Sequence, residues 1–138
     1  MNLIELNNLI ENTFKSNPLV KSYYATDPYS IWNSSDVKYV SISCYLTGIR
    51  TEDNSITYTF QITCADRLDN KQADTNFIYQ NCFAIIEKTL MQLHTNSDVL
   101  DVSYPRDYQF TNQKFMDVLA VGFVTVNITV RKDIDTCK

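Results

Sequence analysis

Glycine is scarce in this chain of 138 residues, which contains only Gly48 and Gly122. A phosphate-binding loop needs several glycines close together so that backbone N–H groups can surround the phosphate. The sequence therefore excludes a glycine-rich nucleotide site. It also contains only three prolines and no low-complexity tract or linker that would divide it, so residues 1–138 are predicted to form a single domain.

Histidine is also scarce, and the cysteines are not clustered. A zinc site needs about four ligands, but His94 is the single histidine, and Cys44, Cys64, Cys82 and Cys137 show no C-x-x-C spacing. A Ser-His-Asp or Cys-His site would have to use His94, which ends a predicted helix, where a positive charge is favoured in any case. We therefore expect no enzyme activity, metal or cofactor, and we interpret the cysteines as isolated thiols.

Lysine and arginine are scattered singly along the chain, and the formal net charge is -4. Nucleic-acid binders usually carry a basic face, so nonspecific DNA binding is not expected. No apolar run approaches the length of a membrane span, and the N-terminus lacks the basic region of a secretory signal. The expectation is a protein made in the cytoplasm, without contact with a membrane.

Apolar spacing predicts helices over residues 2–15 and 73–94. The first helix has one stripe of apolar residues at steps of three and four, and the second has a broad apolar face. The stripe consists of Leu3, Leu6, Ile10 and Phe14, and the broad face of Phe77, Ile78, Cys82, Ile85, Ile86, Leu90 and Leu93.

Alternating apolar and polar residues predict strands, over residues 37–49, 56–65, 98–104 and 118–131. The first two form a hairpin whose apolar residues are all even-numbered, so its turn should hold an odd number of residues. Two registers remain open: Cys44 lies opposite either Ile62 or Cys64, and only the second would permit a disulfide. The predicted fold is α+β: a mostly antiparallel sheet of about four strands, with two helices packed on one face.

Two long segments without a clean period complete this fold, an N-terminal arm over residues 17–36 and a loop over residues 104–117. The arm either folds back over the open sheet face or presents a surface to a partner, because tyrosine and tryptophan are enriched at interface cores. We predict docking on a neighbouring subunit or on an adjacent protein of the same assembly, with Trp32 as the main contact. The predicted interface residues are Tyr23, Tyr24, Tyr29, Trp32, Tyr104, Arg106 and Tyr108.

A charged group, Asp66, Arg67 and Asp69, follows the second hairpin strand. Paired carboxylates can perform acid–base chemistry. Aspartate is also typical of turns, because its side chain bonds the nearby backbone. Since nothing completes an active site around these residues, a structural joint between strand and helix is the preferred interpretation.

Taken together, the first helix and three local stretches resemble a known family. The stretches are FQITCADRLDN at the end of the hairpin, NFIYQNCFAIIEKTLMQL in the long helix and VGFVTVNITVRKD in the final strand. Over residues 37–132 the pattern is similar to tail-terminator or tail-completion proteins of tailed bacteriophages. It is most similar to the small neck and tail ring proteins of crAss-like phages.

This resemblance implies a structural virion protein that is not an enzyme. It implies a closed homo-oligomeric ring of six or twelve copies, which contacts the portal or adjacent neck and tail rings. DNA would pass through the lumen without sequence-specific binding. The alternatives are a small cytosolic α+β protein that binds a ligand or a partner, or an enzyme with a diverged site.

Overall fold

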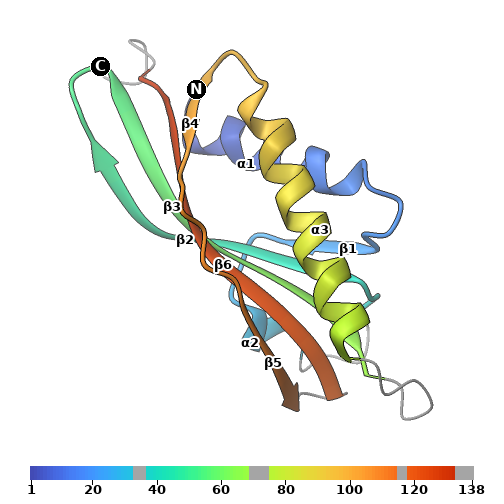
Figure 1. The fold of residues 1–138 in the computed structure, drawn as a ribbon. Coiled ribbons are helices and arrows are strands. Elements are labelled where there is room, and N and C mark those ends of the chain that lie inside the picture. The colour runs from blue at the N-terminus through green and yellow to red at the C-terminus, as the bar shows by residue number, and fades with distance from the viewer. Residues whose placement is uncertain (33–36, 69–74, 115–117, 133–138) are drawn as a thin grey trace.

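The computed structural model describes residues 1–32, 37–68, 75–114 and 118–132. The order is α1 (Leu3–Lys15), β1 (Ser22–Tyr24), α2 (Pro28–Ile31), β2 (Ser41–Thr51), β3 (Ser55–Arg67), α3 (Thr75–His94), β4 (Val99–Val102), β5 (Gln109–Lys114) and β6 (Val118–Arg131). The fold is α+β, and the two long helices, α1 and α3, lie on one side of the sheet (Figure 1).

The sheet has six strands and is mixed, which corrects the expected four antiparallel strands. Its order is β1-β2-β3-β6-β4, and β5 also pairs with β6. β1 lies within the predicted arm and pairs with β2 in parallel. β5 lies within the predicted loop; its sequence, QFTNQK, has almost no apolar residues and so lacks the alternation that would reveal a strand.

The β2–β3 hairpin has the register in which Cys44 faces Ile62. The last pair of the ladder joins Thr51 to Ile56, so four residues, 52–55, separate the paired ends, and the expected odd number is wrong. A register shift between Leu46 and Gly48 marks a β-bulge, which sequence alternation did not predict. The apolar residues of β3 lie on the helix side as expected, since Phe60 and Ile62 are fully buried.

The main hydrophobic core lies between the sheet and the two long helices. Asn2 caps α1, its Oδ1 accepting a hydrogen bond from the Glu5 amide at 2.9 Å. Helix α1 contributes Leu6, Ile10 and Phe14 to this core, and α3 contributes Cys82, Ile85, Ile86, Leu90 and Leu93.

Phe77 was expected in this core but is 64% exposed. Its helix face is the one that carries Ala84 and Lys88, both of which are exposed. The core-facing residues of α3 therefore begin at Ile78, which is partly buried against the main core.

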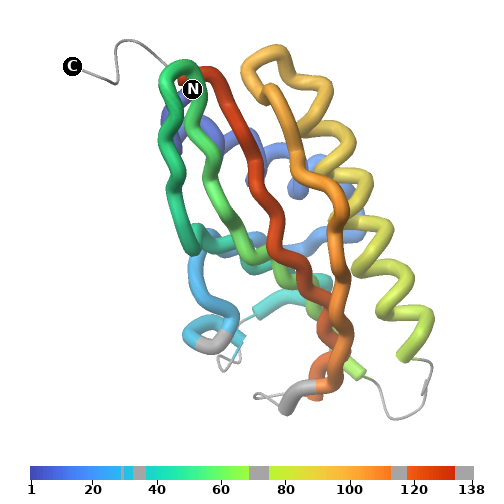
Figure 2. Tube along the Cα trace, turned by 60° about the vertical axis from the view of Figure 1, so that its left-hand side comes forward, coloured from blue at the N-terminus to red at the C-terminus, as the bar shows by residue number. Residues whose placement is uncertain are grey.

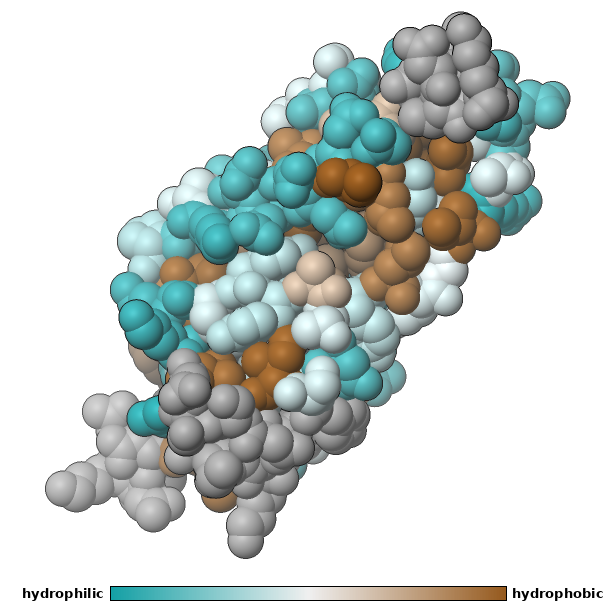
Figure 3. Space-filling model, turned by 180° about the vertical axis from the view of Figure 1, so that it is seen from behind, coloured by the Kyte–Doolittle hydropathy of each residue, from teal (hydrophilic) through white to brown (hydrophobic). Residues whose placement is uncertain are grey.

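A second, smaller core lies on the opposite face of the sheet. Figure 3 shows the surface of the molecule from behind, where hydrophobic and hydrophilic residues are mixed. Ala65 of β3 and Leu119 and Val121 of β6 are odd-numbered, so they point away from the helices. Trp32 and Val37 cover them, and the indole Nε1 of Trp32 donates a hydrogen bond to Ser41 Oγ at 2.9 Å. Trp32 is fully buried in its own chain, so the prediction that it docks on a neighbouring subunit is wrong.

Three cysteines, Cys44, Cys64 and Cys82, are buried free thiols, as expected from the sequence. Burial raises the pKa of Cys44 to about 12, so this thiol stays protonated at neutral pH and reacts slowly. Cys137 lies outside the described residues.

Candidate interface at the β4–β5 edge

β4 and β5 lie one after the other along the same edge of β6, as Figure 2 shows. β4 pairs with the C-terminal part of β6, with Val102 opposite Ile128. β5 pairs with the N-terminal part, beginning with Gln109 opposite Phe123. Residues 103–108 connect the two strands as a loop, and Pro105 suits this break because it has no N–H to donate to a ladder.

Arg106 anchors this loop to α3. Its Nε donates a hydrogen bond to Glu87 Oε2 at 3.0 Å, and a second guanidinium nitrogen pairs with Glu87 Oε1. Another guanidinium nitrogen donates to the Ser103 carbonyl at 3.0 Å. The Arg106 side chain is only 3% exposed, so it holds the loop from inside and does not present its charge to a partner.

Tyr108 completes this anchor, because its hydroxyl donates a hydrogen bond to Glu87 Oε2. The hydrogen bonds from Arg106 lower the pKa of Glu87, against an opposing contribution from burial. Burial, and next the adjacent Glu87 carboxylate, raise the pKa of the Tyr108 hydroxyl. At neutral pH the anchor is therefore a carboxylate held by a guanidinium and a neutral phenol.

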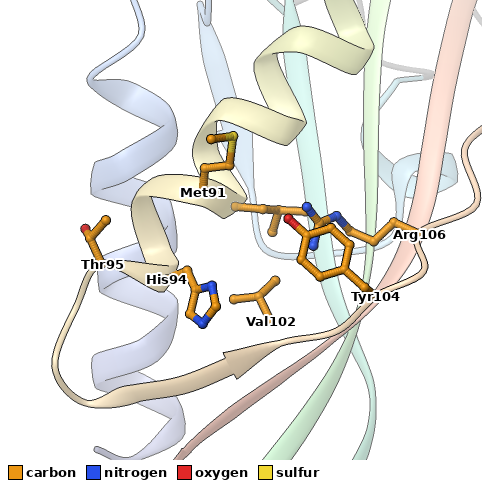
Figure 4. Close-up of a pocket in the computed structure, with 7 residues that line it drawn as sticks. Met91, His94, Thr95, Val102, Tyr104 and Arg106 are labelled. Atoms are coloured by element: carbon orange, nitrogen blue, oxygen red, sulfur yellow. The ribbon is translucent and has the colours of Figure 1, made fainter.

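Tyr104 is the exposed part of the loop. Arg106 Cζ lies 3.7 Å from the centroid of its ring, yet the residue remains 68% exposed. Beside it is a hollow of about 280 Å³ whose walls include Met91 and His94 of α3 and Val102 of β4 (Figure 4). Met91 is itself 61% exposed, so apolar atoms from both the helix and the loop face solvent here.

An aromatic hollow of about 510 Å³ lies on the other side of the Arg106 anchor. Phe83 and Tyr108 meet edge to face with ring centroids 4.9 Å apart, and Tyr79 and Phe110 lie 5.0 Å apart. Phe83 is 36% exposed and Phe110 39%. We call the surface formed by Phe83, Met91, Tyr104 and Phe110 the aromatic edge.

The structure thus brings together three of the predicted interface residues, Tyr104, Arg106 and Tyr108, on one side of the molecule. Of the arm residues, Tyr23 packs half-buried against the main core, with its ring centroid 5.9 Å from that of Phe14. Tyr24 packs half-buried against the second core. The side chain of Tyr29 lies outside the described residues.

Glu87, Phe83 and Met91 were missed by the sequence prediction. They recur at four-residue steps along α3, on the side away from the apolar face that was recognised. A second helical stripe containing two large apolar residues and one acid was the available signal.

A basic hollow of about 590 Å³ lies where the end of β3 meets the residues that precede β2. Its lining combines three basic residues with one acid and two apolar or aromatic side chains: Lys21, Lys38, Arg67, Asp66, Val37 and Tyr39. Arg67 Cζ lies 5.3 Å from the centroid of the Tyr39 ring.

Asp66 and Arg67 behave in part as the expected joint, since Asp66 Oδ1 accepts a hydrogen bond from the Arg67 amide at 2.8 Å. Partial burial raises the pKa of Asp66, an effect that the neighbouring Arg67 opposes. Asp69 lies outside the described residues. The two residues therefore form a local turn contact beside the basic hollow.

The linings of the three hollows include one histidine, His94, and no cysteine or serine among the described residues. Within the part of the chain that the structure describes, no three histidine, cysteine, aspartate or glutamate side chains lie close enough together to hold a metal ion. His94 faces the hollow beside Tyr104 in Figure 4. In the same described ranges, none of the helices has the length and apolar character needed to cross a membrane.

A scan of the sequence against protein-family models finds no match, and neither does a search of curated proteins.

Proposed function

We propose that this protein is a structural subunit of a ring in the neck or tail of a tailed bacteriophage, made in the host cytoplasm and incorporated into the virion. The ring would contain six or twelve copies and contact the portal or adjacent ring proteins. In this role the protein performs no catalysis and needs no cofactor. The proposal rests on the sequence resemblance and on the surface that the fold presents.

The observation that carries this proposal is the aromatic edge. Met91 and Tyr104 each expose more than half of their surface, and Phe83 and Phe110 more than a third. Clustered exposed aromatic and methionine side chains are typical of interface cores. Because the loop is held by Arg106 and Tyr108, it would lose little conformational freedom on binding.

The charge of the protein is compatible with DNA passage. DNA affinity depends on phosphate neutralisation by lysine and arginine, and this chain has 12 basic against 16 acidic residues. A ring of such subunits would carry a net negative charge and would not hold DNA tightly.

Native mass spectrometry of the purified protein tests the proposal. The expected result is a closed species with the mass of six or twelve chains. Cryo-electron microscopy of the phage neck and tail would then identify the ring and its neighbours. A protein that remains monomeric at high concentration and is missing from purified virions would contradict the proposal.

The second candidate is a small ligand- or partner-binding protein, which the aromatic hollow favours. Its volume, about 510 Å³, is within the range of small-molecule sites, and its walls are mainly aromatic. A monomer whose melting temperature rises with an aromatic or aliphatic small molecule would support this alternative. A ring without any ligand-induced shift would support the first.

A further inference from the structure

We propose that the loop of residues 103–108 in one copy inserts into the basic hollow of the next copy. This inference rests on the proposed ring and names the two surfaces that would join its subunits. The loop presents Tyr104 and the exposed carboxylates of Asp101 and Asp107 nearby. The hollow presents Lys21, Lys38 and Arg67.

The charges of the two surfaces are opposite. At the loop, the charge of Arg106 is already neutralised by Glu87, so the adjacent exposed aspartates leave an excess of negative charge. In the hollow, the exposed Lys21 and Lys38 stand beside one acid of the described lining, Asp66. Complementary charge between surfaces speeds their encounter and disfavours wrong pairings.

The shapes of the two surfaces also correspond. Tyr104 projects from the loop and is 68% exposed. The loop itself is fixed to α3 by the ion pair between Arg106 and Glu87. The hollow has a volume of about 590 Å³, and Tyr39 provides an aromatic wall. A projecting aromatic residue with acidic neighbours thus meets a concave basic surface with an aromatic wall.

The positions of the two surfaces are compatible with a ring. The sheet order β1-β2-β3-β6-β4 places the hollow on the β2 side of β3 and the loop on the far side of β6. The two surfaces therefore lie toward opposite edges of the sheet. Contact between two different patches of successive copies is heterologous, and such contacts form a ring when the rotation from one copy to the next closes.

Reciprocal charge reversal tests this contact. Asp107→Lys makes the loop more basic, and Lys38→Glu makes the hollow more acidic. Each variant alone should associate at least about tenfold more weakly than the wild type, because like charges then face each other. Both positions are exposed, so the melting temperature of the monomer should not change. Glu52→Lys, a similar charge change in the hairpin turn, is the matched control and should form rings normally.

Mixing the two variants gives the sharpest outcome. In an alternating ring every contact again joins opposite charges, so an equimolar mixture should restore rings that contain equal numbers of both chains by native mass spectrometry. The double variant Asp107→Lys/Lys38→Glu should form rings by itself. Assembly should also weaken at high salt.

The outcomes separate this contact from the ring proposal. Normal rings from both single variants, or no recovery on mixing, would overturn the contact while leaving the ring in place. A wild-type protein that is monomeric at every concentration would overturn both.

Discussion

The N-terminal arm and the loop of residues 103–108 are both rich in aromatic residues without regular spacing, yet the structure treats them differently. Trp32 of the arm is fully buried, whereas Tyr104 of the loop is 68% exposed. The arm, which includes the short helix α2, lies against the sheet face opposite the two long helices, where it buries Ala65, Leu119 and Val121. The loop lies at the sheet edge, where it is held by a polar anchor. Aromatic composition therefore does not determine whether a segment joins the core or an interface. The deciding factor is whether the segment lies next to an apolar sheet surface that needs to be covered.

The strongest test of this comparison is Trp32→Ala. Removal of a fully buried tryptophan should lower the free energy of unfolding by about 3–5 kcal/mol, measured by denaturant unfolding. Trp32→Phe keeps most of the apolar volume and loses only the hydrogen bond to Ser41, so it should cost about 1 kcal/mol. If Trp32→Ala lowers the free energy of unfolding by less than about 1 kcal/mol, Trp32 is not part of the buried core.

Glu87→Ala should have the next largest effect, about 3 kcal/mol, because it leaves the buried Arg106 guanidinium without its carboxylate. The pH dependence of stability provides the control. The pKa of Glu87 is lower in the folded state, so its stabilisation is present above the ordinary glutamate pKa of about 4.3 and is lost as the pH falls through the lowered value.

The stability difference between the wild type and Glu87→Gln should accordingly be constant near neutral pH and shrink in acid. A difference that grows below pH about 4 would mean that the carboxylate is not held by Arg106.

Gly122→Ala tests how closely β5 and α3 approach β6. A Cβ at Gly122 would lie 2.9 Å from a Phe110 ring carbon and 3.2 Å from Cys82 Cβ. The expected cost is about 1–3 kcal/mol from overpacking, and Phe110→Ala in the same chain should recover part of it. At Gly48 the nearest atoms are 3.9 Å away, so Gly48→Ala should cost nothing measurable by thermal unfolding.

Tyr104→Ala should have the smallest effect on the single chain. It removes an exposed ring and its contact with Arg106, worth about 1 kcal/mol or less. If the aromatic edge is an interface, the same change should weaken ring assembly by about 2 kcal/mol or more, measured by native mass spectrometry over a dilution series. A large loss of monomer stability with normal assembly would place Tyr104 in the same class as Trp32.

Much of the architecture follows from residue spacing. The even-numbered apolar residues of the hairpin predicted its helix-facing side, and the broad stripe over α3 predicted five of the residues that α3 buries. Strand β5 could not be predicted in this way, because QFTNQK is held by hydrogen bonds to β6 and not by an apolar face.

The place of Trp32 depends on information that two-residue alternation does not contain. In β6 the stretch VLAVGFV is apolar without alternation, and both of its faces are buried, since Ala120 and Val121 are each at most 1% exposed. A continuous apolar run of this kind indicates cover on both sides of a sheet. The anchor of Arg106 on Glu87 joins residues that only the folded chain brings together.

Strands β3 and β6 each contribute side chains to the main core on one face and to the second core on the other. The two strands pair without a break, from Ser55 opposite Arg131 to Arg67 opposite Leu119. Separation of β3 from β6 would therefore disrupt the main core and the second core together. Amide hydrogens in the middle of these two strands should exchange with solvent most slowly, and only by global unfolding. The two paired strands therefore form the cooperative unit that sets the lifetime of the native state.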